Sequence, residues 1–207
     1  SKATVEKAIE SSKKAFVKWS KTTPINRSRI LAKYKDLLIK NMEELAEMVS
    51  EQYAPIPLMS TLKHPLMGGG MSIANFRKCV RVFEQTNLRG PRPNPGLLGI
   101  DKLFSDEKKP EGNIIEWWQS LRKIIEPFDK LMQEEANFGK LLVAHVEMAE
   151  KLASISDEKG DKRLWKGDDG EAAASLIEDL LMAAPYMSQF SSDQYVALFE
   201  QFMNSVT

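Results

Sequence analysis

The chain has 207 residues, of which 43% are hydrophobic and 28% are charged, and its 29 basic and 29 acidic side chains give a net charge of zero. This balance excludes a uniformly basic nucleic-acid-binding protein and a disordered polyanion. No apolar run approaches the roughly 18 residues that a membrane helix requires. The single cysteine, Cys79, excludes an internal disulfide framework and a multi-cysteine metal site. We therefore expect a cytoplasmic protein with no membrane partner. Because the chain starts at Ser1 without a methionine, we also expect an excised or incomplete reading frame.

A helical hairpin is the first predicted element. Apolar residues recur about every 3.6 positions over residues 3–19 and again over residues 25–52, which is the spacing of amphipathic helices. Thr23 and Pro24 lie between the two segments and are typical of a helix cap and of a first helical position. Residues 1–53 are therefore expected to form a hairpin of two helices.

Pro55 and Pro57 interrupt this pattern, and we place the principal boundary of the chain here, ahead of a multi-helix domain over residues 55–207. Its predicted helices cover residues 72–86, 113–136, 138–155, 171–184 and 193–206, after a short apolar segment at 58–66. Loops rich in proline, glycine or polar residues are expected at 88–99 and 157–170. No stretch alternates apolar and polar residues as a half-buried strand does, so the sequence predicts an all-α fold.

Three local features refine these boundaries. Pro127 predicts an interruption of the helix over residues 113–136. Asp168 and Glu171 have the spacing of a capping box in front of the next helix. Ser192 is the expected cap of the last helix.

Residue types that carry catalysis are sparse. Cys79 is the one candidate nucleophile, and the positive charges near it favour a thiolate. Because no base adjoins it in the sequence, we interpret it instead as a buried or half-buried structural cysteine. His145 and the glutamates after it lack the His-Glu-x-x-His spacing of a zinc site, and residues 68–70 lack the lysine and hydroxyl of a phosphate-binding loop. We predict no catalytic, cofactor-binding or metal-binding residue in this chain.

Charge is distributed unevenly, since residues 55–103 carry a net charge of +5 and residues 168–207 carry −7. A proline-stiffened loop that holds Arg89 and Arg92 would lose little conformational entropy on meeting phosphates. The candidate DNA-contacting residues are Lys63, His64, Arg77, Lys78, Arg81, Arg89 and Arg92. Ordinary surface charge is the alternative, because aromatic residues for base stacking are not interleaved with them. The acidic end covering the basic region is a third interpretation.

The segments AIESSKKAFVKW (8–19), RSRILAKYKDLL (27–38) and NMEELAEMVSEQ (41–52) resemble the N-terminal region of the aldehyde dehydrogenase superfamily. In that family the run continues into glycine, lysine and proline, which Tyr53, Ala54 and Pro55 replace here. The resemblance implies NAD-dependent aldehyde chemistry. The family's cofactor domain, glutamate base and cysteine nucleophile all lie downstream of this stretch, so none of them is carried over.

The segments LKHPL (62–66), LRGPRPNPGLLG (88–99), RLWKGDDGEAAA (163–174) and YVALFEQF (195–202) resemble an internal part of the AddB subunit of the bacterial AddAB helicase–nuclease. The resemblance implies a non-catalytic helical scaffold for double-strand-break repair, with DNA and an AddA-like subunit as partners. The family's nucleotide-fold region and nuclease domain are absent from these residues.

Taken together, the two resemblances indicate a chimera that is joined near residues 53–55. The main interpretation is a DNA-repair segment, and the alternatives are an N-terminal fragment of an NAD-dependent aldehyde dehydrogenase or a helical protein-interaction module. Since packing between unrelated halves was never selected, we expect few buried contacts between residues 1–52 and 60–207, together with exposed apolar surface.

Overall fold

The computed structural model of the chain describes residues 21–104 and 112–204. Its α-helices are α2 (Pro24–Ser50), α3 (Pro55–Lys63), α4 (Ile73–Thr86), α5 (Leu97–Lys102), α6 (Gly112–Met132), α7 (Phe138–Ala153), α8 (Gly160–Leu164), α9 (Gly167–Ala183) and α10 (Ser192–Asn204), with a 3₁₀ turn η1 (Ala184–Tyr186). Two short strands, β1 (Ala136–Asn137) and β2 (Gln189–Phe190), pair in antiparallel fashion. The predicted all-α fold is confirmed. The helix predicted over residues 3–19 lies outside the described residues.

The contacts between residues group the chain into two compact units, residues 1–36 and residues 37–207, and the division falls within α2. In the first unit the structure describes residues 21–36, which hold the first turns of α2. Pro24 is the first residue of this helix, and the backbone N–H of Asn26 donates to Thr23 Oγ1 at 3.4 Å. The predicted start of the second helix is therefore confirmed, and the cap satisfies a donor that the first turn leaves unpaired.

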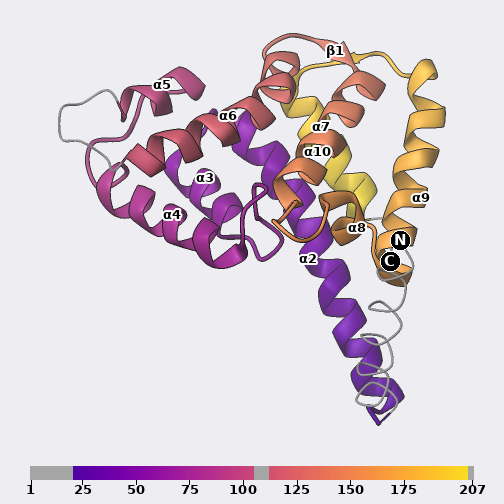
Figure 1. The fold of residues 1–207 in the computed structure, drawn as a ribbon. Helices are drawn as coiled ribbons and strands as arrows, with labels where there is room; N and C mark the ends of the chain where they lie inside the picture. The colour runs from indigo at the N-terminus through magenta and orange to yellow at the C-terminus, as the bar shows by residue number, and fades with distance from the viewer. Residues whose placement is uncertain (1–20, 105–111, 205–207) are drawn as a thin grey trace, which may run out of the picture. The chain divides into compact units, whose positions relative to one another are not determined.

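The second unit is built around α6 and α7, which pack closely against each other. Helix α4 packs on α6, α3 packs on α4, and both α8 and α9 pack on α7. Figure 1 shows α4 and α5 on one side of this unit and α9 on the other, with α7 and α10 between them. Large side chains from successive helices fill the core, among them Leu45, Phe76, Phe128, Leu142 and Phe199.

Residues 37–53 belong to the core of this second unit. Leu45 is fully buried, the hydroxyl of Thr61 donates to the Glu44 carbonyl oxygen at 2.9 Å, and the hydroxyl of Tyr53 donates to Asp129 Oδ1 at 2.6 Å. The expectation of few buried contacts between residues 1–52 and 60–207 is therefore wrong for residues 37–52. The apolar stripe of the second predicted helix meets complementary faces of the following helices.

Three helix boundaries differ from prediction. Helix α6 runs through the exposed Pro127 without a break, and it packs on both α4 and α7. Helix α5 begins inside the loop predicted over 88–99, because Leu97 and Ile100 are buried against the core. Helix α3 starts at Pro55 itself, a first-turn position that proline tolerates.

Two predicted caps lie one or two residues away from the observed ones. Helix α9 starts at Gly167, so Asp168 lies within its first turn and does not precede it. Helix α10 includes Ser192, and the box is formed one residue earlier: Ser191 Oγ accepts from the Gln194 N–H at 3.4 Å, and Gln194 Oε1 accepts from the Ser191 N–H at 3.0 Å. This reciprocal pair has the geometry of a capping box.

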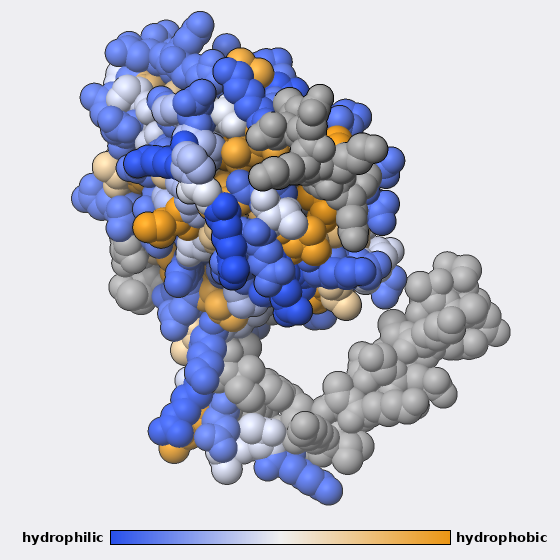
Figure 2. Space-filling view, turned by 90° about the vertical axis from the view of Figure 1, so that its left-hand side faces the viewer, coloured by the Kyte–Doolittle hydropathy of each residue, from blue (hydrophilic) through white to orange (hydrophobic). Residues whose placement is uncertain are grey.

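The surface is mixed in polarity. Figure 2 shows a face on which hydrophilic side chains predominate and hydrophobic ones lie between them. Exposed large hydrophobic residues include Ile56, Leu98, Met182 and Tyr186. Among the residues that the structure describes, no helix combines the length and apolar character needed to cross a membrane.

Candidate functional site

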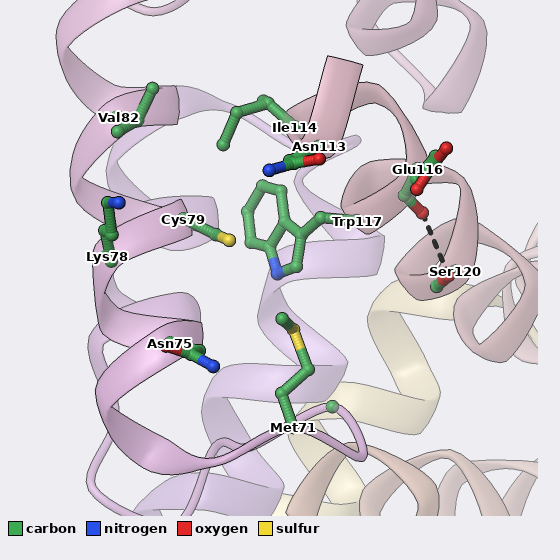
Figure 3. Close-up of a pocket in the computed structure, with 11 residues that line it drawn as sticks. Met71, Asn75, Lys78, Cys79, Val82, Asn113, Ile114, Glu116, Trp117 and Ser120 are labelled. Atoms are coloured by element: carbon green, nitrogen blue, oxygen red, sulfur yellow. Dashed lines mark hydrogen bonds between the residues drawn. The ribbon is translucent and has the colours of Figure 1, made fainter. Parts of the chain in front are cut away.

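The α4–α6 pocket, a hollow of about 460 Å³ between these two helices and the loop before α4, is the candidate site. Its volume falls in the range of small-molecule sites, roughly 300 to 1,000 Å³. Its lining residues are Gly69, Met71, Asn75, Lys78, Cys79, Val82, Asn113, Ile114, Glu116, Trp117 and Ser120. Figure 3 shows Cys79 and Asn75 of α4 pointing toward the side of the pocket that holds the Trp117 ring.

Helical periodicity explains which side chains reach this pocket. Helix α4 contributes Asn75, Lys78, Cys79 and Val82, which occupy positions i, i+3, i+4 and i+7 and therefore share one face. Helix α6 repeats the same spacing with Asn113, Glu116, Trp117 and Ser120. The adjacent face of each helix turns into the core, so two amphipathic helices place two polar stripes opposite each other.

The Trp117 indole forms the inner wall of the pocket. Trp117 is 4% exposed and packs edge-on against Phe76, with ring centroids 6.0 Å apart, and at a tilt against Phe83, with centroids 5.7 Å apart. Its Nε1 has no hydrogen-bond acceptor among the described residues. By contrast, Trp118 Nε1 donates to Asp101 at 2.8 Å and Trp165 Nε1 donates to Glu150 at 2.6 Å.

Cys79 lies half-buried on the opposite wall. Burial raises the pKa of its thiol, and this effect outweighs the opposing charge of Lys78 and the opposing hydrogen bond with the Cys79 backbone. The prediction that nearby positive charge favours a thiolate is therefore wrong, because desolvation is the larger influence. At neutral pH Cys79 is a thiol, which agrees with its interpretation as a structural cysteine.

Of the seven candidate DNA-contacting residues, five are exposed, whereas Arg77 is half-buried and His64 is buried. The exposed residues are Lys63, Lys78, Arg81, Arg89 and Arg92. Lys63 forms an ion pair with Glu84 at 2.7 Å. The half-buried Arg77 donates to the carbonyl oxygen of His64 at 3.3 Å. A DNA contact by this set stays a prediction.

His64 differs from the rest of this set because it is buried, with 3% exposure. Its Nδ1 accepts the backbone N–H of Leu66 at 3.3 Å and lies 3.2 Å from Asn41 Nδ2, an arrangement in which Nδ1 carries no proton. Burial lowers the pKa of the imidazole. His64 is therefore a neutral, buried residue between α3 and Asn41 of α2, and its ring offers no positive charge to DNA.

Two other sequence features also have structural explanations. The backbone N–H groups of Gly68 and Gly69 donate to the Leu152 carbonyl oxygen, and that of Gly70 donates to the Ser154 carbonyl oxygen. Because α7 takes these donors, the glycine cluster is not a phosphate cradle. Within the described chain, Asp168 and Glu171 form no ion pair with Arg89 or Arg92.

Of the residues that line this pocket, the sequence analysis singled out Cys79 as a candidate nucleophile and Lys78 as a candidate DNA contact. It missed the polar residues around them. The signal was present, because Asn75 and Asn113 open two stripes with the i, i+3, i+4, i+7 spacing. What the sequence could not show is that the two stripes face each other. No group of three or more metal-ligating side chains that could hold an ion is found among the described residues.

Comparison with known proteins finds relatives for the N-terminal part of the chain. The aldehyde dehydrogenase family matches residues 1–61. Malonate-semialdehyde dehydrogenases of Bacillus pumilus and Shouchella clausii are 47% and 49% identical to it over 49 residues. These matches cover 24% of this chain and 10% of each relative, so the match spans about a tenth of the relatives' length. No solved structure matches the chain significantly.

These comparisons correct the main interpretation of the sequence. The matches name aldehyde dehydrogenases, and nothing in them supports a resemblance of residues 55–207 to AddB or a part in DNA repair. The four motifs that carried that resemblance are short, and several of their residues, such as Leu97 of α5 and Phe199 of α10, are buried core residues. What the comparisons show is a short N-terminal segment that is similar to aldehyde dehydrogenases.

Proposed function

We propose that this chain carries the N-terminal helical segment of an NAD-dependent aldehyde dehydrogenase and serves aldehyde oxidation through that segment, without catalytic residues of its own. The observation that carries the proposal is the sequence identity of 47 to 51% over 49 residues with malonate-semialdehyde dehydrogenases. By this proposal, the substrate class is a short aldehyde with a carboxylate, as the names of the relatives state.

The packing of α2 supports a structural use of the segment. Leu38, Met42, Leu45 and Val49 form an apolar stripe that is almost completely buried. Such a stripe needs a partner face, whether in this chain or in a dehydrogenase. Within the described residues the strands are two residues long and antiparallel, whereas a dinucleotide site needs a glycine-rich turn after a strand of a parallel sheet.

A segment exchange tests this proposal. The matched 49 residues of the Bacillus pumilus malonate-semialdehyde dehydrogenase are replaced by those of this chain, and formation of NADH from malonate semialdehyde is followed by its absorbance. We expect a soluble enzyme that retains most of its activity, because the stripe is preserved. A matched exchange carrying Leu45→Asp is the control and is expected to lose soluble enzyme. A soluble exchange enzyme without activity would overturn the proposal.

The chain itself provides the second arm of the test. With NAD and malonate semialdehyde, the purified chain is expected to form no NADH. Turnover by the chain alone would contradict its non-catalytic role, because it would require a nucleophile and a cofactor site within these 207 residues.

A further inference from the structure

We propose that the α4–α6 pocket binds a small uncharged molecule that presents a carbonyl-type oxygen to Trp117 Nε1. The proposal concerns residues 69–120, which lie outside the segment with aldehyde dehydrogenase similarity. It therefore stands or falls independently of the proposed function.

The first argument is the unpartnered indole N–H. Trp117 is 4% exposed and lines the pocket, yet its Nε1 has no acceptor in the described chain. A buried N–H donor without an acceptor is unusual in folded proteins and needs an explanation. The other tryptophans in the described ranges, Trp118 and Trp165, both have carboxylate partners. A bound ligand with an acceptor oxygen supplies what Trp117 lacks.

The second argument is the chemistry of the walls. Val82, Ile114 and the Trp117 ring offer apolar surface, and the side-chain amides of Asn75 and Asn113 offer both donors and acceptors. Lys78 and Glu116 add charges of both signs to the lining, which gives no preference for a strongly charged ligand. A molecule with a flat apolar part and one amide or carbonyl group fits this combination.

Access to Nε1 depends on Met71. The Nε1 atom is covered, and Figure 3 shows the Met71 side chain extending toward the nitrogen edge of the indole. Methionine has three rotatable bonds and adapts readily to a neighbour. Movement of this side chain opens Nε1 to a ligand, so Met71→Ala is expected to strengthen binding.

Benzamide and toluene form a matched pair of probes. Both have one aromatic ring, but only benzamide has a carbonyl oxygen that can accept the indole N–H. We expect benzamide to bind in the millimolar range, to shift the indole N–H resonance of Trp117 in nitrogen-correlated NMR spectra, and to slow alkylation of Cys79 by iodoacetamide. Cys79 is the only cysteine of the chain, so one mass increment reports on the pocket alone.

Variants then distinguish the contribution of the hydrogen bond to binding from that of the cavity. Trp117→Phe keeps an aromatic wall without the N–H and should weaken benzamide about tenfold while leaving toluene unchanged. Val82→Phe fills the pocket and should abolish binding of both probes and their protection of Cys79. If Trp117→Phe fails to fold, Met71→Ala supplies a different test, because uncovering the indole N–H should strengthen the binding of benzamide.

The contradicting results are equally definite. If benzamide neither shifts the Trp117 resonance nor protects Cys79 in the parent chain and in Met71→Ala, the proposal is wrong. Equal affinity for toluene and benzamide would also overturn it, because the acceptor would then contribute nothing.

Discussion

Tyr53 lies in the turn after α2, in a backbone conformation that side chains rarely adopt. Its φ is +62°, and that of Gln52 is +50°, in the left-handed region that costs non-glycine residues about 1 kcal/mol or more each. The aldehyde dehydrogenase run continues into glycine here, which would relieve the strain. Tyrosine instead gains a buried ring and a hydrogen bond of 2.6 Å to Asp129, and burial with this carboxylate raises the pKa of its hydroxyl.

The contribution of the Tyr53–Asp129 hydrogen bond to stability can be measured with Tyr53→Phe. Removing the hydroxyl leaves the buried Asp129 with one donor fewer, and we expect a loss of about 1 to 3 kcal/mol in the free energy of unfolding. Tyr186→Phe is the matched control, because Tyr186 is 92% exposed and should change stability by less than about 0.5 kcal/mol. Urea unfolding compares the two. Equal effects would show that the Asp129 bond contributes nothing.

His145 gives the fold a defined pH dependence. It is fully buried, its ring stacks on Phe128 at 4.9 Å, and its Nδ1 lies 3.0 Å from the Tyr195 hydroxyl. Burial lowers its pKa from 6.5 to about 3, although the Met42 backbone opposes the shift. The folded chain therefore keeps the ring neutral where the unfolded chain binds a proton.

Stability should consequently fall as the pH falls. The unfolded chain takes up a proton at His145 below about pH 6.5 and the folded chain only near pH 3, so between these values the unfolding free energy decreases by up to about 1.4 kcal/mol per pH unit. His145→Gln keeps a polar partner for Tyr195 and removes the titration. Its unfolding free energy, measured from about pH 7 to about pH 5, should show a slope smaller by that amount. Parallel slopes would contradict the assignment.

At the scale of residues, the sequence identified residue types but not their surroundings. Cys79 and Lys78 are neighbours in sequence, which favours a thiolate, yet the pKa of Cys79 depends more on the α6 wall that buries it. His64 follows Lys63 and has the position of a residue in a basic run, yet the contact between α2 and α3 buries it. Both outcomes depend on tertiary packing, which a linear pattern does not contain.

Helix α8 is held against the end of α7 at a position where only glycine fits. A Cβ on Gly160 would lie 1.6 Å from the Glu150 carbonyl oxygen and 2.9 Å from the Ser154 nitrogen. The backbone N–H of Gly160 donates to Ser154 Oγ at 2.9 Å, which ties α8 to the end of α7. Since the obstructing atoms are backbone, they cannot move aside without disturbing α7.

Gly160→Ala should therefore destabilise the fold by about 3 kcal/mol or more. Gly90→Ala is the control, because Gly90 has open space around its Cβ position and no positive φ, and its change should be within about 1 kcal/mol. Thermal and urea unfolding report both. A near-neutral Gly160→Ala would mean that α8 does not pack on α7 in this way.

Helix α10 gives a second prediction at this scale. The reciprocal hydrogen bonds between Ser191 and Gln194 stabilise its first turn. Ser191→Ala is expected to lower the free energy of unfolding by about 1 kcal/mol, while Ser192→Ala, one residue into the helix, should have a smaller effect. If Ser192→Ala were the more damaging change, the cap predicted from the sequence would be right after all.

Helices whose apolar residues recur every three to four positions could be predicted from the sequence. Helices that are stabilised by packing against another part of the chain could not. Helix α4 (Ile73–Thr86) matches the helix predicted over residues 72–86 to within one residue, because its apolar residues recur with a clear helical period. Helix α5 was assigned to a loop, since a six-residue helix has too few turns to show a period and is stabilised by burial of Leu97 and Ile100.

At the scale of the whole molecule, the composition and the helical spacing of apolar residues were enough to predict the all-α class. They were not enough to predict where one structural unit ends and the next begins. We placed that boundary at Pro55 and Pro57, where the pattern breaks. The structure divides the chain at residues 36 and 37, within an uninterrupted helix. A proline pair ends a helix locally, whereas a structural unit ends where buried contacts end, and Leu38, Leu45 and Val49 are all buried in the second unit.

Native-state hydrogen exchange tests the central claim that residues 37–53 share one core with the rest of the second unit. Amides in the middle of α7, such as those of Leu141 and Leu142, should exchange only on global unfolding. We predict that the amides of Leu45 and Val49 open with the same free energy and the same denaturant dependence. Exchange of Leu45 and Val49 through a separate, lower-energy opening while α7 stays protected would contradict it, and would show a helix docked on an independent domain.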